Sequence, residues 1–465
     1  MIKRLGILNA AVHFILWMAA LYFFVRVGAG NLKLSFGGVL YADALSAFLI
    51  FTTATINFAA ALFSVSFIAT DLILGKITER KALYYYLLFN LFAAAMFLVP
   101  LINNLGGLWV AIELTTLISS FLVGFYNTRH SVEAAWKYLI ICSVGITLAL
   151  FGAILFTFAL STATGIKSLN WTDLLAAAKM LNPNIVRIAF IFILVGYGTK
   201  AGLAPMHTWL PDAHSQAVSP VRAMLSGVLL KCSLYAILRY GMVVAQCCGA
   251  PFYTNLMLVF GLLSLIIACI FIITQRDLKR LLAYSSIEHL GLIAIGVGLN
   301  SPLALFGALL HLFNHAVSKA LMFFCAGRIS QVYGTHEMKK ITGVSRVLPV
   351  TGFAMLVGFF ALIGFPPCSI FISEFYLVSA AFIGGSYFVG VLLLGLLAVI
   401  GAALLYHFGK LLFGKPPQPA ISSVEPYGNW LAYGFLLFFI IGLGIFIPSV
   451  LQQGLNAAAA ILRGE

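Results

Sequence analysis

The chain has 465 residues, of which 62% are hydrophobic and only 9% are charged, and its mean hydropathy is +1.06. Soluble domains carry about 25% charged residues, so this composition excludes a soluble protein and predicts a polytopic helical membrane protein in contact with the lipid bilayer. The net charge of +14 would indicate a nucleic-acid partner in a soluble chain. Here it is explained by cytoplasmic loops rich in Lys and Arg, and no nucleic-acid partner is expected.

Apolar segments long enough to cross a bilayer recur from end to end, and the sequence predicts about thirteen transmembrane helices. In chain order the predicted spans are Leu5–Val25, Ala42–Thr70, Leu83–Pro100, Leu105–Phe125, Tyr138–Leu160, Ile188–Ala204, Pro220–Val244, Leu256–Thr274, Leu278–Val297, Pro302–Ile329, Val347–Phe382, Phe388–Phe413 and Trp430–Val450. The first run is long and no small-residue cleavage site precedes Arg26, so it is expected to be an uncleaved span. Because the loops are short, residues 1–465 are predicted to form one membrane domain.

The distribution of basic residues predicts the orientation of the chain. If the N-terminus is cytoplasmic, most of the 27 Lys and Arg residues fall in loops on that side. An odd number of spans then places the C-terminus on the periplasmic side. Three lysines, Lys200, Lys231 and Lys319, belong to neither side because they lie inside predicted spans.

Two predicted spans are interrupted by Gly and Pro, at Lys200–Pro205 and at Gly364–Pro367. Each is the fourth member of a group of five spans, the first within residues 81–246 and the second within 253–415. Consecutive groups with an odd number of spans have opposite topology, which is the hydropathy pattern of an inverted repeat. The sequence therefore predicts two inverted five-helix repeats, each with one broken helix. The remaining parts are N-terminal helices in 1–80 and a C-terminal helix in 416–465.

Ionisable side chains inside the predicted spans are the candidate functional residues. A charge at membrane depth costs roughly 3 kcal/mol and usually faces a partner or a water-filled cavity. Besides the three lysines, the candidates are Glu113, Glu288, His289, His311, His315 and Glu374. His311, His315 and Lys319 follow one another at i, i+4 and i+8, so they share one stripe of a helix. The first helix break adds Pro205, His207, Asp212 and His214, which are predicted to form a loop.

The histidines have structural alternatives. A lone intramembrane histidine often serves as a hydrogen-bonded packing residue, and His207 and His214 could cap the loop or ligate a metal. His311 and His315 could ligate a b-type haem, but only if another helix presents a facing histidine at the same depth.

The alternation of acids and amines along the spans favours proton movement. A nearby carboxylate favours the charged form of a buried lysine, whereas burial alone disfavours it. A change in the distance between Glu113 and Lys200 would therefore switch the lysine between holding and releasing a proton. A structural ion pair between the two is the alternative, but buried pairs stabilise poorly compared with apolar residues. Asp43 and Asp71, at span ends, are expected to be interfacial.

No redox or nucleotide site is visible in the sequence. The seven cysteines form no C-x-x-C pair, no haem-attachment motif and no ferredoxin-like cluster. There is no phosphate-binding loop and no dinucleotide fingerprint. No cofactor and no metal are therefore expected in this chain.

Long stretches of the chain resemble the antiporter-like membrane subunits shared by respiratory complex I, Mrp-type cation/proton antiporters and membrane-bound hydrogenases. They are WVAIELTTL, KAGLAPMHTWLPDAHSQAVSP with the following GVLLKCSLYAILRY, QRDLKRLLAYSSIEHLG, NHAVSKALMFFCAGRI and GFPPCSIFISEF. SVEAAWKYLIICSVGI, YSSIEHLG and FPPCSIFISEF are most similar to hydrogenase-4 component F and its relatives in formate hydrogenlyase-type complexes.

The resemblance implies a role in proton translocation for six of the candidate residues. They are the channel glutamate Glu113, its paired broken-helix lysine Lys200, the bridging lysine Lys231, the central-axis histidines His289 and His315, and the terminal Glu374. Family members have about fourteen spans. This chain is expected to begin at the family's second helix and to lack the long lateral helix of the most distal complex I subunit.

The resemblance implies a proton-translocating, or sodium-translocating, subunit of an energy-converting hydrogenase-like complex in the bacterial inner membrane. The [NiFe] centre and iron–sulfur clusters are expected in a peripheral arm, and other membrane subunits are expected as partners. Three alternatives stay open: an Mrp-type cation/proton antiporter subunit, a membrane subunit of NADH:quinone oxidoreductase (complex I), and a purely structural membrane scaffold.

Overall fold

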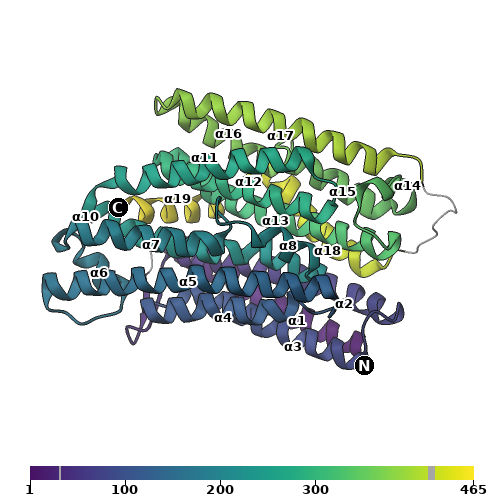
Figure 1. Cartoon of the computed structure of the whole chain (residues 1–465), viewed down its shortest axis with the longest axis horizontal. Helices are drawn as coiled ribbons and strands as arrows, with labels where there is room; N and C mark the ends of the chain where they lie inside the picture. The colour runs from purple at the N-terminus through teal and green to yellow at the C-terminus, as the bar shows by residue number, and fades with distance from the viewer. Residues whose placement is uncertain (31–32, 417–424) are drawn as a thin grey trace.

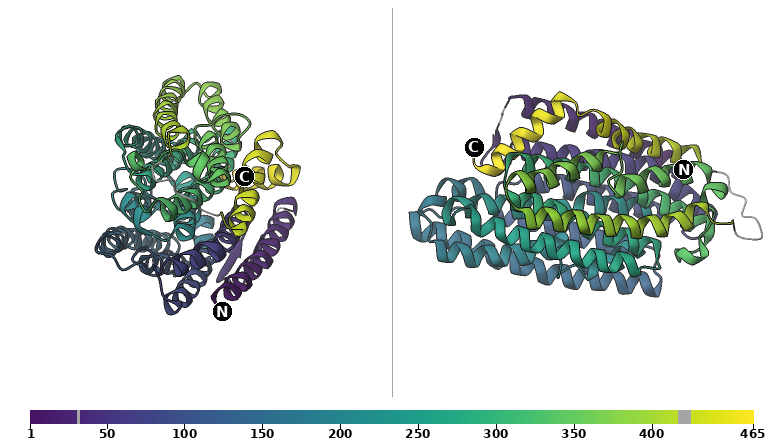
Figure 2. Two further views of the ribbon diagram at one scale, coloured as in Figure 1. Left: turned by 90° about the vertical axis from the view of Figure 1, so that its right-hand side faces the viewer. Right: turned by 90° about the horizontal axis from the view of Figure 1, so that it is seen from above.

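The computed structural model describes residues 1–30, 33–416 and 425–465, which are almost entirely helical. Twelve helical segments within these ranges are long and apolar enough to cross a membrane. Most of them run along the long axis of the molecule, as the views in Figure 1 and Figure 2 show. The chain is therefore an all-α polytopic membrane protein, and the predicted fold class is confirmed.

The helices follow the predicted spans closely. The twelve segments are α1 Ile2–Gly30, α2 Ala44–Ile73, α3 Glu79–Leu98, α4 Leu105–Val123, α5 Arg129–Thr164, α7 Pro183–Ala201, α9 Ser219–Met224 continuing into α10 Leu230–Cys248, α11 Ala250–Thr274, α12 Leu278–Leu299, α13 Pro302–Tyr333, α17 Tyr387–Phe413 and α18 Tyr427–Ile445. The remaining predicted span, Val347–Phe382, consists of two shorter helices, α15 Pro349–Leu362 and α16 Ser369–Ile383. The short helices α6 Trp171–Ala176 and α14 Val344–Val347 lie in the connections.

Both predicted helix breaks are present. α7 ends at Ala201, and the chain becomes helical again in α8, Trp209–Gln216. Gly202 and Gly364 lie in the two breaks with φ of 81° and 63°, in the left-handed region where a side chain would be strained. The helix order is consistent with two successive five-helix groups, each with a broken fourth member, and the inverted relationship between the groups stays a prediction.

Two features differ from the predicted spans. A two-stranded antiparallel hairpin, β1 Leu34–Phe36 and β2 Leu40–Ala42, follows α1. The last span ends at Ile445 instead of Val450, and a further helix, α19 Ser449–Arg463, packs against α1, α2 and α13. Residues 417–424 of the predicted C-terminal part lie outside the described residues.

The helices that carry most of the intramembrane charges form the centre of the bundle. In α12, in α13 and in the segment from α9 to α10, the whole 18-residue apolar window of the span is buried. In α5, α11 and α17 less than half of that window is buried, as expected for helices that face lipid. The charged side chains of the central helices are therefore shielded from the bilayer by the outer helices.

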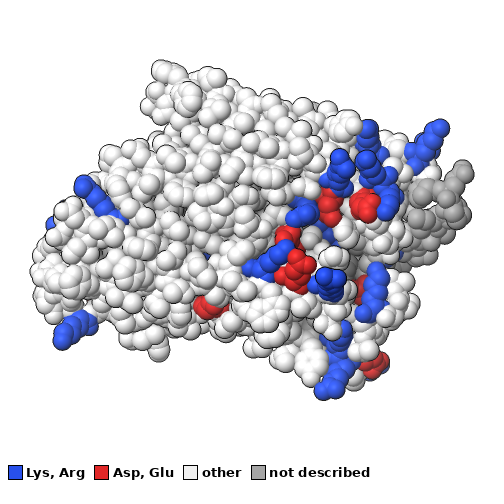
Figure 3. Space-filling view, viewed as in Figure 1, with Lys and Arg blue, Asp and Glu red and all other residues white. Residues whose placement is uncertain are grey.

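Charged side chains also mark one end of the molecule. On the face shown in Figure 3, most charged side chains gather in the half of the molecule where the N-terminus lies, and a few Lys and Arg side chains lie at the opposite end. An excess of basic residues toward one end is the pattern expected of a membrane protein that obeys the positive-inside rule.

Asp43 and Asp71 lie at the two ends of α2, consistent with the predicted position at span ends, and each is only 1% exposed. Asp43 accepts hydrogen bonds of 2.7 and 2.6 Å from Arg239. Asp71 accepts hydrogen bonds from Tyr126 and Gln331. Both carboxylates have partners from distant parts of the chain, so they join helix ends together instead of facing solvent.

Candidate functional site

Lys200, in the last turn of α7, is completely buried, and two hydroxyl groups hold its ammonium group. Its Nζ donates hydrogen bonds of 2.7 Å to Thr116 Oγ1 and of 2.6 Å to the Tyr138 hydroxyl. Tyr138 also shares a 2.7 Å hydrogen bond with Ser119 Oγ. The amine therefore has neutral polar partners on α4 and α5, at the point where α7 breaks.

Glu113 lies one helical turn before Thr116 on α4 and is only partly buried. Ser143 Oγ on α5 donates a 2.7 Å hydrogen bond to Glu113 Oε1. Glu113 Oε2 is buried and has no hydrogen-bond partner among the described residues. The carboxylate thus keeps one acceptor position open beside the two helices that also hold Lys200.

The structural ion pair between Glu113 and Lys200, which was the alternative to a functional role, is not formed. Within residues 1–30, 33–416 and 425–465, no ion pair with an N–O distance of 4.0 Å or less joins these two side chains. The reason is that the ammonium group points to Thr116 and Tyr138 instead. Both charges still contact α4 and α5, which is the arrangement that a variable Glu–Lys separation requires.

Lys231 is also completely buried and is the second residue of α10, which follows a π-helical turn, Leu225–Leu229, that separates α9 from α10. A π-helical turn changes which backbone carbonyl groups are engaged in the helix, and such turns are frequent at functional sites. Lys231 Nζ donates a 2.6 Å hydrogen bond to the Ser226 carbonyl oxygen, which lies within this turn. The sequence predictions did not include this irregular turn.

A line of hydrogen bonds connects Lys231 with Lys319. The hydroxyl groups of Ser226 and Ser286 are 2.8 Å apart. Ser286 Oγ donates a 3.0 Å hydrogen bond to the Leu282 carbonyl oxygen, and Lys319 Nζ donates a 2.9 Å hydrogen bond to the same oxygen. The line runs from the π-helical turn across α12 to α13.

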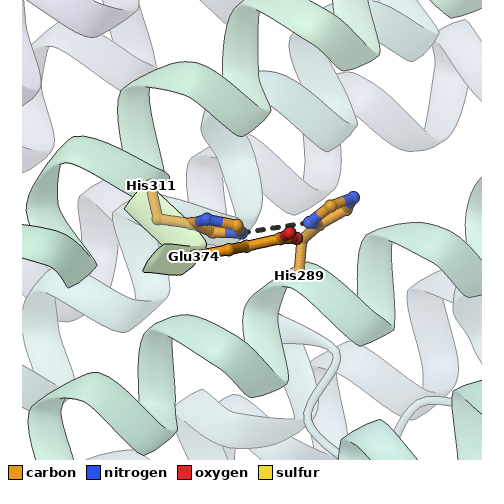
Figure 4. A group of neighbouring side chains, drawn as sticks. All are labelled: His289, His311 and Glu374. Atoms are coloured by element: carbon orange, nitrogen blue, oxygen red, sulfur yellow. Dashed lines mark hydrogen bonds between the residues drawn. The ribbon is translucent and has the colours of Figure 1, made fainter. Parts of the chain in front are cut away.

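Three histidines and Glu374 gather in the interior between α12, α13 and α16. His289 Nδ1 and His311 Nε2 are 3.0 Å apart, and His311 Nδ1 is 2.9 Å from Ser373 Oγ. The rings of His289 and His315 have centroids 4.8 Å apart. Figure 4 shows the Glu374 carboxylate pointing to the contact between His289 and His311. We call His289, His311, His315 and Glu374 the histidine–glutamate cluster.

Several polar atoms in this region are buried without a hydrogen-bond partner in the described part of the chain. They are Glu288 Oε2, His289 Nε2, Glu374 Oε1 and both ring nitrogens of His315. A buried polar atom without a partner costs about 1–3 kcal/mol, so such atoms are uncommon where only stability is at stake. They are positions where a proton, a water molecule or a cation can bind.

Asp212 and His214 are helical residues of α8 and not part of a loop, which corrects the prediction. Arg280 donates a 2.5 Å hydrogen bond to one oxygen of Asp212, and Lys137 Nζ is 3.5 Å from the other. Asp212 therefore joins α8 to α12 and α5. His214 Nδ1 is 3.0 Å from the Leu210 carbonyl oxygen, one turn earlier in the same helix.

Pro205 and His207 lie between α7 and α8, as predicted for the break. His207 is nearly buried and lies beside the rings of Phe271 and Tyr284. Among the described residues, no group of three or more metal-type ligands includes a histidine of this break.

The histidines meet only part of the requirement for binding a haem. His289 on α12 faces His311 on α13 at the same depth, as the haem alternative requires. The two rings are in direct contact at 3.0 Å, however, and a porphyrin cannot lie between them. These histidines are therefore arranged as neighbours and not as the two axial ligands of a haem.

The hydroxyl groups around the charges were missed by the sequence predictions. The missed residues are Thr116, Tyr138, Ser226, Ser286 and Ser373. The signal that could have indicated all of them except Tyr138 is a hydroxyl residue within five positions of a buried lysine or acid, as in IELTT, LSGVLLK, SSIEH and FISEF. Tyr138 is far in sequence from the charges that it contacts, so no such local signal marks it.

These features define a polytopic membrane protein whose interior carries a row of ionisable residues at interrupted helices. The model of the NADH:quinone oxidoreductase/Mrp antiporter transmembrane family matches residues 102–401 of the chain. The chain belongs to this family and is an antiporter-like subunit of the superfamily that includes complex I, Mrp and hydrogenase membrane subunits. The resemblance noted in the sequence is thereby confirmed.

Individual relatives cover most of the chain. It is 36% identical over 454 residues to the hydrogenase-4 component F homolog of Methylacidiphilum infernorum (isolate V4), covering 96% of this chain and 94% of the relative. It is 33% identical over 354 residues to NADH-quinone oxidoreductase subunit N of Desulforudis audaxviator (strain MP104C), covering 75% and 69%.

Solved structures show the same fold. A chain of the membrane-bound sulfane sulfur reductase, an archaeal respiratory membrane complex, superposes with a TM-score of 0.86 at 24% identity, covering 98% of this chain and 92% of that one. A chain of the Mrp complex from Dietzia sp. DQ12-45-1b gives a TM-score of 0.84 at 22% identity, covering 99% and 93%. At such low identity these similarities concern the fold alone.

Proposed function

We propose that this chain is a proton-translocating subunit of a membrane-bound, energy-converting hydrogenase-like complex. The observation that carries the proposal is a row of ionisable side chains within the helices, next to two helix breaks and a π-helical turn. The row consists of Glu113, Lys200, Lys231, Lys319, Glu288, His289, His311, His315 and Glu374. Ionisable groups at membrane depth mark ion pathways or proton relays in most proteins that contain them.

Hydrogen bonds already present place a pair of hydroxyl groups between the surroundings of Lys231 and those of Lys319. Ser226 and Ser286 can pass a proton to one another because hydroxyl groups both donate and accept, whereas the two lysines bond to backbone carbonyl oxygens, which cannot relay a proton. Transfer between either lysine and this pair therefore requires side-chain rotation or the entry of water. From Lys319 the row continues to His315, one turn earlier on α13, and then to His289 through the ring contact. The described hydrogen bonds do not join Lys200 to Lys231, so passage between these two lysines requires side-chain rotation or the entry of water.

The surroundings of Lys200 offer its ammonium group two positions, one that favours holding the proton and one that favours releasing it. Its ammonium group is bound to neutral hydroxyl groups, while Glu113 Oε2 has an open acceptor position nearby on α4. Rotation of Lys200 toward Glu113 would form an ion pair and favour the protonated amine. Return to Thr116 and Tyr138 would remove the negative charge from its surroundings and favour release of the proton.

The chemistry of the row favours protons over sodium ions. A hard cation such as Na⁺ takes oxygen ligands, whereas the histidine–glutamate cluster offers mainly imidazole nitrogens. An imidazole ring can accept a proton at one nitrogen and donate a proton from the other, which suits a relay.

Partner subunits complete the proposal. The name of the Methylacidiphilum relative supports a hydrogenase-type complex, in which [NiFe] and iron–sulfur centres of a peripheral arm would drive the membrane subunits. Glu113 is partly exposed on the isolated chain, although a carboxylate at membrane depth needs cover from lipid. We expect another membrane subunit to cover this face of α4 and α5, in a bacterial inner membrane with the N-terminus cytoplasmic.

Affinity purification of the native complex tests the assembly. We expect nickel and iron–sulfur proteins among the partners, together with further membrane subunits. Partners consisting of small membrane subunits alone would instead support an Mrp-type antiporter. An NADH-oxidising partner with bound quinone would support a complex I-type assembly.

Reconstitution of the same complex into sealed vesicles tests transport. We expect electron transfer to acidify the vesicle interior with wild-type protein, and the Lys319→Met complex to lose most of this acidification. Lys410→Met is the matched control, because Lys410 is an exposed lysine at the end of α17. Equal acidification by the wild-type and Lys319→Met complexes would favour the structural scaffold.

A further inference from the structure

The histidine–glutamate cluster brings three possible metal-ligand atoms close together, an arrangement that proton transfer alone does not require. One nitrogen of His289, one nitrogen of His311 and one carboxylate oxygen of Glu374 all lie within 4.8 Å of one another. They come from three different helices, α12, α13 and α16, so the tertiary fold and not local sequence brings them together (Figure 4). Two imidazoles and one carboxylate form a ligand set that proteins use for Zn²⁺.

The spacing of these atoms is close to what a zinc ion needs. With zinc–ligand distances of about 2.0–2.1 Å in a tetrahedral site, two ligand atoms lie roughly 3.3 Å apart. His289 Nδ1 and His311 Nε2 are 3.0 Å apart, so they must separate by only a few tenths of an ångström. The Glu374 oxygen must approach the nitrogens, which a rotation of its flexible side chain can provide.

The surroundings supply what a bound ion would further require. His311 Nδ1 contacts Ser373 Oγ at 2.9 Å, which orients the ring and leaves Nε2 toward the cluster. His315 lies against His289, and neither of its nitrogens has a hydrogen-bond partner among the residues that the structure describes. Glu374 is 8% exposed, whereas the three histidines are completely buried, so an ion would reach the cluster past Glu374.

We propose that the histidine–glutamate cluster is a binding site for Zn²⁺, with His289, His311 and Glu374 as its ligands. The ion would replace the direct contact between the two imidazoles and hold α12, α13 and α16 in fixed relation. This inference goes beyond the proposed transport function, and the cluster geometry alone supports it. Because the proposed proton route includes histidines of the same cluster, bound zinc would block proton transport along it.

Zinc binding to the purified complex, prepared without a polyhistidine tag, tests this site directly. The probe is Zn²⁺ alone, with the affinity measured against a chelator of known strength and the ligands identified by X-ray absorption at the zinc edge. We expect one tightly bound ion per copy of this chain, with nitrogen and oxygen ligands that include at least two imidazoles. His311→Gln and Glu374→Gln should each weaken binding by roughly 100-fold or more.

His407→Gln is the matched control, since His407 is a half-buried histidine on α17 that contacts the Ile272 carbonyl oxygen. It should leave zinc affinity unchanged. Three results would each overturn the assignment. They are the absence of tight zinc binding to the wild-type complex, a sulfur ligand in the absorption spectrum, and an unchanged zinc affinity in both cluster variants. The spectrum of the wild-type complex decides the matter even if one variant fails to assemble.

Discussion

Lys231 Nζ donates a 2.6 Å hydrogen bond to the carbonyl oxygen of Ser226, within the π-helical turn that separates α9 from α10. The same serine uses its hydroxyl group to contact Ser286 on α12 at 2.8 Å. One residue thus holds a buried amine through its backbone and reaches the next helix through its side chain. The irregular turn is therefore part of the proposed route and not a packing defect.

Ser226→Ala separates these two functions of Ser226. The substitution removes the hydroxyl contact to Ser286 but keeps the carbonyl oxygen that binds Lys231, so we expect assembly with slower proton transport. One hydrogen bond is worth about 1 kcal/mol, which corresponds to a reduction of roughly fivefold. Ser330→Ala is the control, because Ser330 bonds only to its own helix at Ala326. Equal transport rates in the two variants would show that the contact to Ser286 is not used.

Tyr138→Phe tests the partners of Lys200. It removes one of two hydrogen bonds to a buried ammonium group, and hydrogen bonds to charged groups contribute about 1.5–3 kcal/mol. We expect a lower melting temperature of the purified complex and reduced transport. Tyr197→Phe provides the comparison, since the Tyr197 hydroxyl is buried with no hydrogen-bond partner in the described ranges. A larger loss of stability in Tyr197→Phe would contradict our description of Lys200.

Asp43→Asn tests the buried ion pair at the start of α2. The Arg239 guanidinium would lose its counter-charge while remaining buried, and breaking such a pair costs about 3–5 kcal/mol. We expect poor assembly or a clearly lowered melting temperature. Combining Asp43→Asn with Arg239→Gln should be milder than Asp43→Asn alone, because no unpaired charge remains. Thermal unfolding of the single and the double variant checks this. If the double variant were less stable than Asp43→Asn alone, the unpaired charge of Arg239 would not be the cause of the lost stability.

Gly364→Ala tests the contact between the second helix break and Glu374. A Cβ at Gly364 would collide with Glu374 Oε2, and the backbone has a φ of 63°. Gly385→Ala is a matched control with a φ of 75° and open space around the position. Both variants carry backbone strain of about 1–2 kcal/mol, so any larger loss of stability in Gly364→Ala measures what it costs to move the flexible Glu374 side chain away. Adding Glu374→Ala to Gly364→Ala should recover that difference, and failure to recover it would refute the contact.

The sequence predicted the spans because length and hydrophobicity are local properties of each segment. It also predicted both helix breaks, since Gly202 and Gly364 occur together with prolines inside apolar runs. Burial of Asp43 could not be predicted in this way. Its position at a span end looked interfacial, and only the fold brings Arg239, almost two hundred residues later, to its side.

The sequence predicted which charged residues form the candidate site but not which groups these residues contact. Every buried lysine was visible as a charge inside a span, but which group each lysine contacts depends on neighbouring helices. Lys200 illustrates the limit: a nearby acid, Glu113, was expected as its partner, whereas hydroxyl groups on α4 and α5 hold the amine. The π-helical turn before Lys231 leaves no signal in hydropathy, because all its residues suit an ordinary helix.

The most direct test of the proposed function is proton uptake by vesicles containing the complex with Lys200→Met, beside Lys410→Met and the wild type. Methionine is an unbranched side chain only one heavy atom shorter than lysine, and it removes the ionisable group at the end of α7. With assembly confirmed for all three, we expect electron transfer to acidify the vesicles with the wild type and Lys410→Met but not with Lys200→Met. Acidification by the Lys200→Met complex at the wild-type rate would contradict the proposal that protons pass through this lysine.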